Sequence, residues 1–225
     1  MGPMVAANNF LELMRSSPFN FVGVRCRLHG SLAFTGVGHA TDRAITLGLE
    51  GFTPENYDEV KASKALSRIQ STHFLEPDGL GKLKFNTSED LIFDYGPRLD
   101  EHSNGLILYA IDHQGDVILE EIYFSIGGGF ILTKSEFLKQ SPNEIGTEVP
   151  YPFKTAAEML QMARSSGKSI AEMKRDNERA LHSNAEIKDG LSRIWKTMDM
   201  CIKRGLENDG QLPGGLNVKR RAKGI

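Results

Sequence analysis

A glycine-bounded segment, Gly30–Asp42, gathers the side chains in this chain that are best suited to chemistry. It reads Gly-Ser-Leu-Ala-Phe-Thr-Gly-Val-Gly-His-Ala-Thr-Asp. Histidine titrates near neutral pH, so His39 is a candidate general base, with Ser31, Thr41 and Asp42 as polar neighbours. The alternative is structural: His39 and Thr41 cap a following helix, and Asp42 stabilises its positive end. The segment lacks the third glycine that a dinucleotide fingerprint requires.

A second polar group follows at Glu101–Gly105, which reads Glu-His-Ser-Asn-Gly. His102 and Asn104 are two residues apart, so on an extended chain they project to the same side. Together they could grip a carboxylate or an amine. The alternative is a polar turn, because Asn-Gly is a common turn dipeptide.

A glycine run after an aromatic strand pattern is the third candidate. It contains Ser125, Gly127 and Gly128 within Tyr-Phe-Ser-Ile-Gly-Gly-Gly. Exposed amides of such a run can form an anion-binding nest, and the alternative is a bend or β-bulge. The histidines form no H-x-x-x-H pair, and Cys26 and His29 lie three apart in a strand, on opposite faces. The patterns therefore predict no metal site.

The elements that must position these residues follow from hydrophobic period. A helix is expected over 1–16, and alternation predicts a strand over 20–29. A helix should run from His39 or Thr41 to Leu49, and Thr53-Pro54 predicts the start of a helix over 54–72. Strands are expected at 83–85, 91–95, 105–112, 116–125 and 130–133, with a hairpin turn at 112–116. This order predicts an α+β domain over 1–133, with an antiparallel sheet and packed helices.

The remainder of the chain reads as helical. Turn residues predict a linker over 134–153. Capping boxes at Thr155/Glu158 and Ser169/Glu172 predict helices over 156–166 and 170–204, with a break at Gly167. The second helix carries an apolar stripe that must be buried against something. Little chain remains to cover it, so this region is not expected to be a complete domain.

Composition excludes several classes of protein. The chain has 225 residues, 40% of them hydrophobic, and a net charge of −2, so nucleic acid and anionic membrane are not expected partners. No run approaches the length of a membrane helix. Two cysteines far apart, Cys26 and Cys201, fit a reducing, cytoplasmic setting, with a long-range disulfide as the alternative.

Several motifs follow one another along the chain: Gly30–Asp42, Gly51-Phe-Thr-Pro54, His102-Ser-Asn104-Gly105, Ser125-Ile-Gly-Gly-Gly129, Leu212-Pro-Gly-Gly-Leu216 and Arg220-Arg221-Ala222. In order and rough spacing they resemble the bacterial iron–sulfur L-serine dehydratases, over nearly the whole chain. Members of that family have a small β domain and a larger helical catalytic domain that binds a 4Fe-4S cluster through cysteines. The resemblance implies that 1–133 is the β domain, 134–153 the linker and 154–225 the N-terminal part of the catalytic domain.

The resemblance also implies an activity, an ammonia-lyase that dehydrates L-serine to pyruvate and ammonia in serine metabolism and gluconeogenesis. The cluster iron would act as a Lewis acid on the leaving hydroxyl. Another group must take the α-proton, and His39 is the expected base. His102 and Asn104 would orient the substrate or support the base. The expected pocket lining is Ser31, Thr41, Ser125, Gly127 and Gly128.

The chain departs from the family pattern in ways that affect this expectation. A Ser-Ser-Ser-His-Thr segment that the family has before Gly-Pro-Met is absent, and Ser103 stands where the family often has proline. Neither cysteine matches a cluster ligand of the family. We therefore expect a partial copy that is inactive alone. Its expected partners are L-serine, the remainder of the catalytic domain and a second copy in a homodimer.

Two non-enzymatic hypotheses stand beside this one. The family's β domain resembles the small-molecule-binding domain of some amino-acid biosynthetic dehydrogenases, so the chain could be a regulatory module that binds serine or a small anion. Alternatively, the long helix with Leu191 and Trp195 could serve protein interaction.

Overall fold

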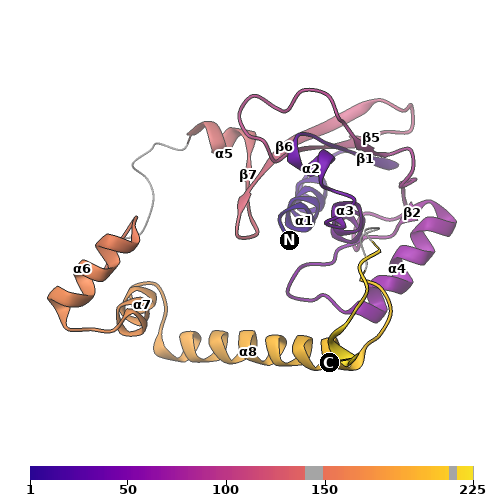
Figure 1. Cartoon of the computed structure of the whole chain (residues 1–225). Coiled ribbons are helices and arrows are strands. Elements are labelled where there is room, and N and C mark those ends of the chain that lie inside the picture. Colours follow the sequence, from indigo (N-terminus) through magenta and orange to yellow (C-terminus); the bar gives the residue numbers. More distant parts are fainter. Residues whose placement is uncertain (140–148, 213–216, 225) are drawn as a thin grey trace. The chain divides into compact units, whose positions relative to one another are not determined.

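The computed structural model describes residues 1–139, 149–212 and 217–224. The chain divides into two compact units, one of residues 1–140 with 212–217 and one of 141–211 with 218–225. The first unit carries helices α1–α5 and the strands, and the second carries α6–α8 and the short helix η1 (Ala222–Gly224) (Figure 1). The predicted linker includes residues 140–148, and the predicted Leu-Pro-Gly-Gly-Leu motif includes 213–216. Both of these ranges lie outside the described residues.

Within the described residues, the first unit is built on a seven-stranded sheet with the order β2-β3-β1-β5-β6-β7, and β4 also pairs with β1. The central strand β1 pairs antiparallel with β5 and parallel with β3 and β4. The prediction of an α+β unit is confirmed, and the predicted antiparallel sheet is mostly antiparallel, with β1–β3 and β1–β4 as parallel pairs. The strands are β1 (Gly23–Leu28), β2 (Phe74–Leu75), β3 (Leu83–Lys84), β4 (Leu91–Phe93), β5 (Gly105–Ile111), β6 (Val117–Gly127) and β7 (Phe130–Thr133).

One face of this sheet is covered by α1 (Gly2–Arg15) and α3 (Thr41–Leu49), which lie against each other (Figure 1). Apolar residues of α1 recur every three or four positions, so one stripe of the helix faces the sheet. The two helices approach closely at Gly48, where an added Cβ would lie 2.5 Å from the carbonyl oxygen of Met4. The shared core includes Phe10, Leu11, Val24, Cys26, Leu28, Ile45, Leu106 and Leu108.

The helix predicted over 54–72 begins later, and its predicted start is wrong. Helix α4 spans Glu59–Thr72, with Asp58 as the N-cap that accepts a hydrogen bond from the Lys61 amide. Thr53 instead closes a turn with Asn56, since each side-chain oxygen accepts from the other residue's amide. A cap-like residue before proline therefore formed an isolated turn here and did not begin a helix.

The two hairpins follow the turn residues. In the turn between β5 and β6, Asp112 Oδ1 accepts from the amides of Gln114 and Asp116, which confirms the predicted turn. Between β6 and β7 the chain turns at Gly127–Gly129, where all three φ angles are positive. The sheet register shifts between Ser125 and Gly127, as the bulge alternative predicted. After β7 the chain continues into α5 (Lys134–Lys139).

The second unit contains α6 (Ala156–Ser166), α7 (Ile170–Arg179) and α8 (Asn184–Glu207). Both predicted capping boxes are formed, and Gly167 ends α6 in the left-handed conformation. The single helix predicted over 170–204 is wrong: it is interrupted before Ser183, which forms a third capping box with Glu186. The Asn177 side chain links α7 to the segment before α6 by two hydrogen bonds of 2.8 Å to the backbone of Tyr151.

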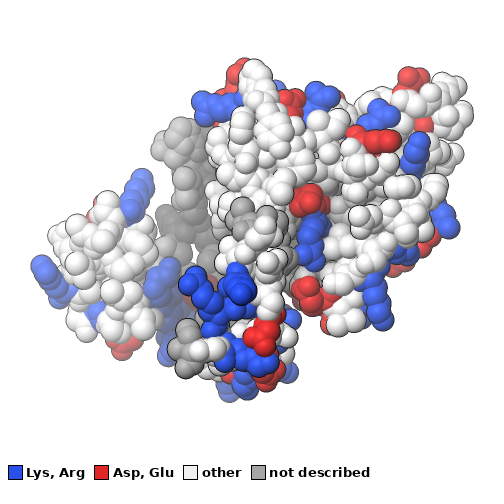
Figure 2. Space-filling view, turned by 45° about the vertical axis from the view of Figure 1, so that its right-hand side comes forward, with Lys and Arg blue, Asp and Glu red and all other residues white. Residues whose placement is uncertain are grey.

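Helix α8 leaves its apolar residues exposed. Leu191, Ile194, Trp195, Met198 and Ile202 are each more than half exposed. This helix is long, but it also carries many charged residues, and no helix in the described part of the chain could cross a membrane. Acidic and basic side chains are interspersed over the surface that Figure 2 shows.

Candidate functional site

Three of the predicted site segments meet at one end of the sheet, where β1 ends, β5 begins and β6 ends. The Ser31 amide donates to the carbonyl of Ser103 over 2.9 Å. The Ser125 amide donates to the carbonyl of Asn104 over 2.9 Å, and Asn104 Nδ2 donates to the Ser125 carbonyl over 3.3 Å. Backbone and side-chain hydrogen bonds thus join segments that are far apart in the sequence.

Gly30 makes the first of these junctions possible. Its φ angle is 53°, in the region that favours glycine. An added Cβ would lie 2.2 Å from the carbonyl oxygen of Ser103, far inside contact distance. Any side chain at this position would therefore push the His102 segment away from the end of β1.

His39 lies between α2 (Ser31–Phe34) and α3, and its side chain is exposed. Its Nδ1 lies 2.9 Å from the Thr35 carbonyl oxygen. A carbonyl can only accept, so in the neutral ring the proton sits on Nδ1 and the lone pair on Nε2. This is the tautomer that a general base acting through Nε2 needs. The glycine-bounded segment thus contains the short helix α2.

The capping alternative for this segment is wrong in its main part. The N-cap of α3 is Ala40, in the left-handed conformation, and no side chain caps the helix. Thr41 is the first helical residue and only 6% exposed, and its amide donates to the Gly36 carbonyl over 2.9 Å. Asp42 does lie in the first turn, where a carboxylate is favoured by the helix dipole.

His102 has the opposite tautomer. Its Nδ1 is 3.0 Å from the Asn104 amide nitrogen, which can only donate. In the neutral ring the proton therefore sits on Nε2, and His102 can donate a hydrogen bond from that atom. The ring is half-buried and lies beside two phenylalanine rings, with centroid distances of 6.1 Å to Phe124 and 5.9 Å to Phe137. The two site histidines are thus suited to different tasks.

The remaining predicted residues are less closely joined. Gly127 and Gly128 lie exposed on the β6–β7 turn. The start of α1 lies beside this turn, since a Cβ on Gly2 would meet Ser125 Oγ at 2.3 Å. Within the described residues, the hydrogen bonds of His39 stay in its own segment, and none reaches His102, Asn104 or Ser125.

A buried histidine that the sequence patterns did not mark as a site candidate, His29, lies beside this site. His29 directly precedes Gly30, is 7% exposed, and neither ring nitrogen has a hydrogen-bond partner among the described residues. Its Nδ1 lies 3.8 Å from Asp94 Oδ2. Burial lowers the pKa of His29, and the Asp94 carboxylate opposes this shift. The sequence signal for His29 was its position: alternation places it on the same side of the strand as Arg25 and Arg27.

The residues present do not fit a 4Fe-4S cluster. Such clusters are held by several thiolates, and the chain has two cysteines. Cys26 is completely buried in β1, where burial raises the pKa of its thiol, and Cys201 is exposed on α8. Across residues 1–139, 149–212 and 217–224, no group of three or more His, Cys, Asp or Glu side chains could hold a metal ion.

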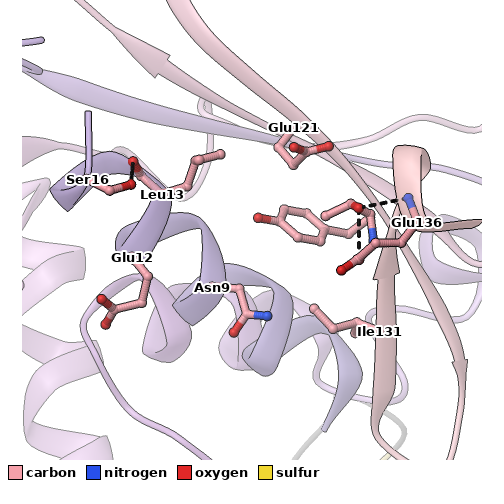
Figure 3. A pocket seen from close by; sticks show the side chains of 9 residues that line it. Asn9, Glu12, Leu13, Ser16, Glu121, Ile131 and Glu136 are labelled. Carbon is pink, nitrogen blue, oxygen red and sulfur yellow. Dashed lines mark hydrogen bonds between the residues drawn. The ribbon is translucent and has the colours of Figure 1, made fainter. Parts of the chain in front are cut away.

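A separate hollow of about 560 Å³ lies between α1, β6, β7 and α5 (Figure 3). Glu12, Glu121 and Glu136 line it together with Asn9. Burial raises the pKa of Glu121. The hollow contains none of the predicted site residues, and its carboxylates would repel the carboxylate of an amino acid.

The chain is similar to serine dehydratases over nearly its whole length. Residues 1–136 match the model of the serine dehydratase beta chain family. The chain is 37% identical over 224 residues to an L-serine dehydratase of Streptomyces coelicolor, and 38% over 226 residues to L-serine dehydratase TdcG of Escherichia coli. An L-serine dehydratase of Haemophilus influenzae is 35% identical over 226 residues. Each alignment covers 99% of this chain and 49% of the relative, so the chain spans about half the length of these relatives.

The match includes each segment that meets at the end of the sheet, from Gly30 to Ser125. It covers well over half of the chain, and the relatives extend the similarity to nearly all of it. The chain therefore belongs to the serine dehydratase beta chain family.

Proposed function

We propose that this chain supplies one wall of the active site of an L-serine ammonia-lyase, which converts L-serine to pyruvate and ammonia by dehydration. One observation carries the proposal: in a member of this family, the segments of Ser31, His102–Asn104 and Ser125 are hydrogen-bonded together at one end of the sheet. In this proposal 1–133 is the β domain with α5 packed on it, the part of 134–153 that follows α5 is the linker, and 154–225 is the first part of the catalytic domain.

His39 is the proposed base in this reaction. Its Nε2 lone pair takes the α-proton of L-serine, and the electron pair of the broken Cα–H bond forms a Cα=Cβ bond as the β-hydroxyl leaves. The Thr35 carbonyl, which accepts from Nδ1–H, would stabilise the imidazolium that forms. The aminoacrylate product then becomes pyruvate and ammonia when water replaces nitrogen.

His102 has a different proposed role. Its Nε2–H would donate to the substrate carboxylate and orient L-serine for proton removal. Asn104 holds His102 in this tautomer through its backbone amide and ties the segment to Ser125 through its side chain. Ser31, Ser125, Gly127 and Gly128 are proposed to line the pocket. Thr41, which is buried, is proposed to support the His39 segment from within the fold.

The proposed enzyme needs more than this chain. Serine dehydratases of this kind use a 4Fe-4S cluster, and the residues described above do not supply its ligands. We propose that the rest of the catalytic domain supplies them, and that the enzyme works in the cytoplasm as a homodimer. Support for a reducing compartment comes from the two free cysteines.

The experiment combines the 225-residue chain with a separately produced second half of a full-length relative, anaerobically and with iron and sulfide. Pyruvate formation from L-serine is expected from the mixture and not from the chain alone. His39→Ala should lower the rate by about 10²–10⁴-fold, the range of general base catalysis. The control is His113→Ala, because His113 is exposed on the β5–β6 turn.

Two results would refute the assignment: pyruvate formation by the chain alone, or equal rates for the His39 and His113 variants. A regulatory module that binds serine or a small anion is the second candidate, favoured by a site without cluster ligands. Calorimetry with L-serine separates the two candidates. Clear affinity without turnover in any mixture supports the module.

A further inference from the structure

Helix α5 lies against the segment that carries His102, although turn residues predicted a linker that includes 134–139. Two neighbouring residues of that segment are held by α5. Lys134 Nζ is 2.6 Å from Glu101 Oε1, and the Phe137 ring lies beside the His102 ring. The Lys134 hydrogen bond lowers the pKa of Glu101, which keeps the carboxylate charged and the pair intact above acidic pH.

Three rings form one cluster at this place. The Phe124 ring of β6 is completely buried, and its centroid is 5.1 Å from that of Phe137 at an interplanar angle of 61°. His102 lies 6.1 Å from Phe124 and 5.9 Å from Phe137, in tilted and edge-on arrangements that aromatic pairs prefer. Phe124 is fixed by the sheet, and Phe137 contacts both other rings, so Phe137 completes the cluster that limits rotation of the imidazole.

The start of α5 is itself fixed to the sheet. Glu136 Oε2 accepts from both the amide and the hydroxyl of Thr133, at 2.8 Å each, and these bonds are drawn at Glu136 in Figure 3. Thr133 pairs with Tyr123 in the sheet. A continuous series of contacts therefore leads from β7 through α5 to His102.

We propose that α5 is a positioning element for His102. Phe137 and Lys134 hold the ring where Nδ1 accepts from the Asn104 amide, so that Nε2–H is presented outward. The catalytic consequence rests on the proposed function, whereas the effect on the ring itself does not. Phe137 is thus a positioning residue that acts through His102 and touches no substrate.

The test uses the whole 225-residue chain with ¹⁵N-labelled histidine. Long-range ¹H–¹⁵N correlations report which ring nitrogen carries the proton. The wild-type chain should show His102 as the Nε2–H tautomer. Phe137→Ala should lose this single pattern and show both tautomers, Phe137→Tyr should restore it, and Leu138→Ala should leave it unchanged. Leu138 is the matched control because it lies next in the same helix and is 65% exposed.

A second variant tests the proposal even if Phe137→Ala does not fold. Lys134→Gln removes the ion pair to Glu101 at a partly exposed position and should shift the tautomer balance in the same direction by a smaller amount. An unchanged Nε2–H pattern in folded Phe137→Ala and Lys134→Gln would overturn the proposal. Absence of pyruvate formation in the mixed-chain assay would refute the proposed function alone, because the tautomer measurement needs no turnover.

Discussion

The two compact units differ in how much of their apolar surface they bury. In the first unit Phe10, Phe85 and Phe124 are completely buried within or against the sheet. Among the described residues of the second unit, Met173 is the one hydrophobic residue that is buried to a similar degree. Trp195 on α8 is 64% exposed. A unit of the first kind has its own core, whereas an amphipathic helix such as α8 is stabilised mainly by what covers its apolar face.

The two units therefore differ in what holds their parts in place. The segments that meet near Ser31, Asn104 and Ser125 are fixed by a sheet with its own core. The helices α6–α8 are shaped by local signals, such as capping boxes, that need no distant partner. We infer that the geometry of the candidate site is set before anything covers α8.

The largest difference should appear when one aromatic residue is removed from each unit. Phe10→Ala should lower the free energy of unfolding of the first unit by about 3–5 kcal/mol, because it leaves a cavity in the core. Trp195→Ala should change the stability of α8 by about 0.5 kcal/mol or less, since the ring is largely exposed. Amide hydrogen exchange resolved by segment measures both. Equal losses in the two variants would show that α8 is already covered and would break the comparison.

A smaller effect is expected at the one buried polar junction described in the second unit. Asn177→Ala removes both hydrogen bonds to the Tyr151 backbone and should destabilise α7 by about 1–3 kcal/mol. Exchange protection of α7 amides is the measurement, and exposed Gln161→Ala on α6 is the control. If protection of α7 is unaffected by the loss of Asn177, the helices are not held by this junction.

The smallest effect concerns pH and should be confined to the first unit. Because the pKa of folded His29 is lowered from 6.5, the unfolded chain takes up this proton first as the pH falls. Stability should therefore decline from about pH 6.5 down to the folded-state pKa, and level off below it. His29→Phe should abolish this decline and also remove two unpaired buried nitrogens.

Urea unfolding at several pH values between 5 and 7.5 measures the effect of His29, with His113→Ala as the exposed control. The exchange rates of α6–α8, corrected for intrinsic pH dependence, should stay constant over this range. Lys168 lowers the pKa of Asp176, so the ion pair between them stays intact there. A decline that persists in His29→Phe would assign the pH dependence to another group.

Local sequence signals predicted individual helices and strands well, but they predicted the pairing of strands in the sheet poorly. Period-2 alternation located β1, and the Thr155 and Ser169 capping boxes located α6 and α7. The break before Ser183 was missed because an apolar helical stripe continues on both sides of it. The parallel pairing of β1 with β4 was not predicted, because nothing within either strand encodes a partner so far along the chain.

The candidate site shows the same division. Residue types and spacing marked His39, His102 and Asn104 as candidates beside structural alternatives, and the family resemblance gave them their predicted roles, which stay predictions. The proton positions on the two histidines depend on the Thr35 carbonyl and the Asn104 amide, and thus on backbone geometry that composition does not reveal. The proposed role of Phe137 was not expected from the sequence, because turn residues nearby made its segment read as a linker.

The central place of β1 has a consequence for how the protein is made. Gly23 in β1 pairs with Ile111 in β5, so the middle of the sheet cannot close until much of the first unit has left the ribosome. Until then α1, β1 and α3 expose apolar faces that the rest of the sheet later covers. Non-local pairing of this kind slows folding and lengthens exposure to aggregation. We therefore expect the nascent chain to depend on chaperones during the synthesis of roughly its first hundred residues.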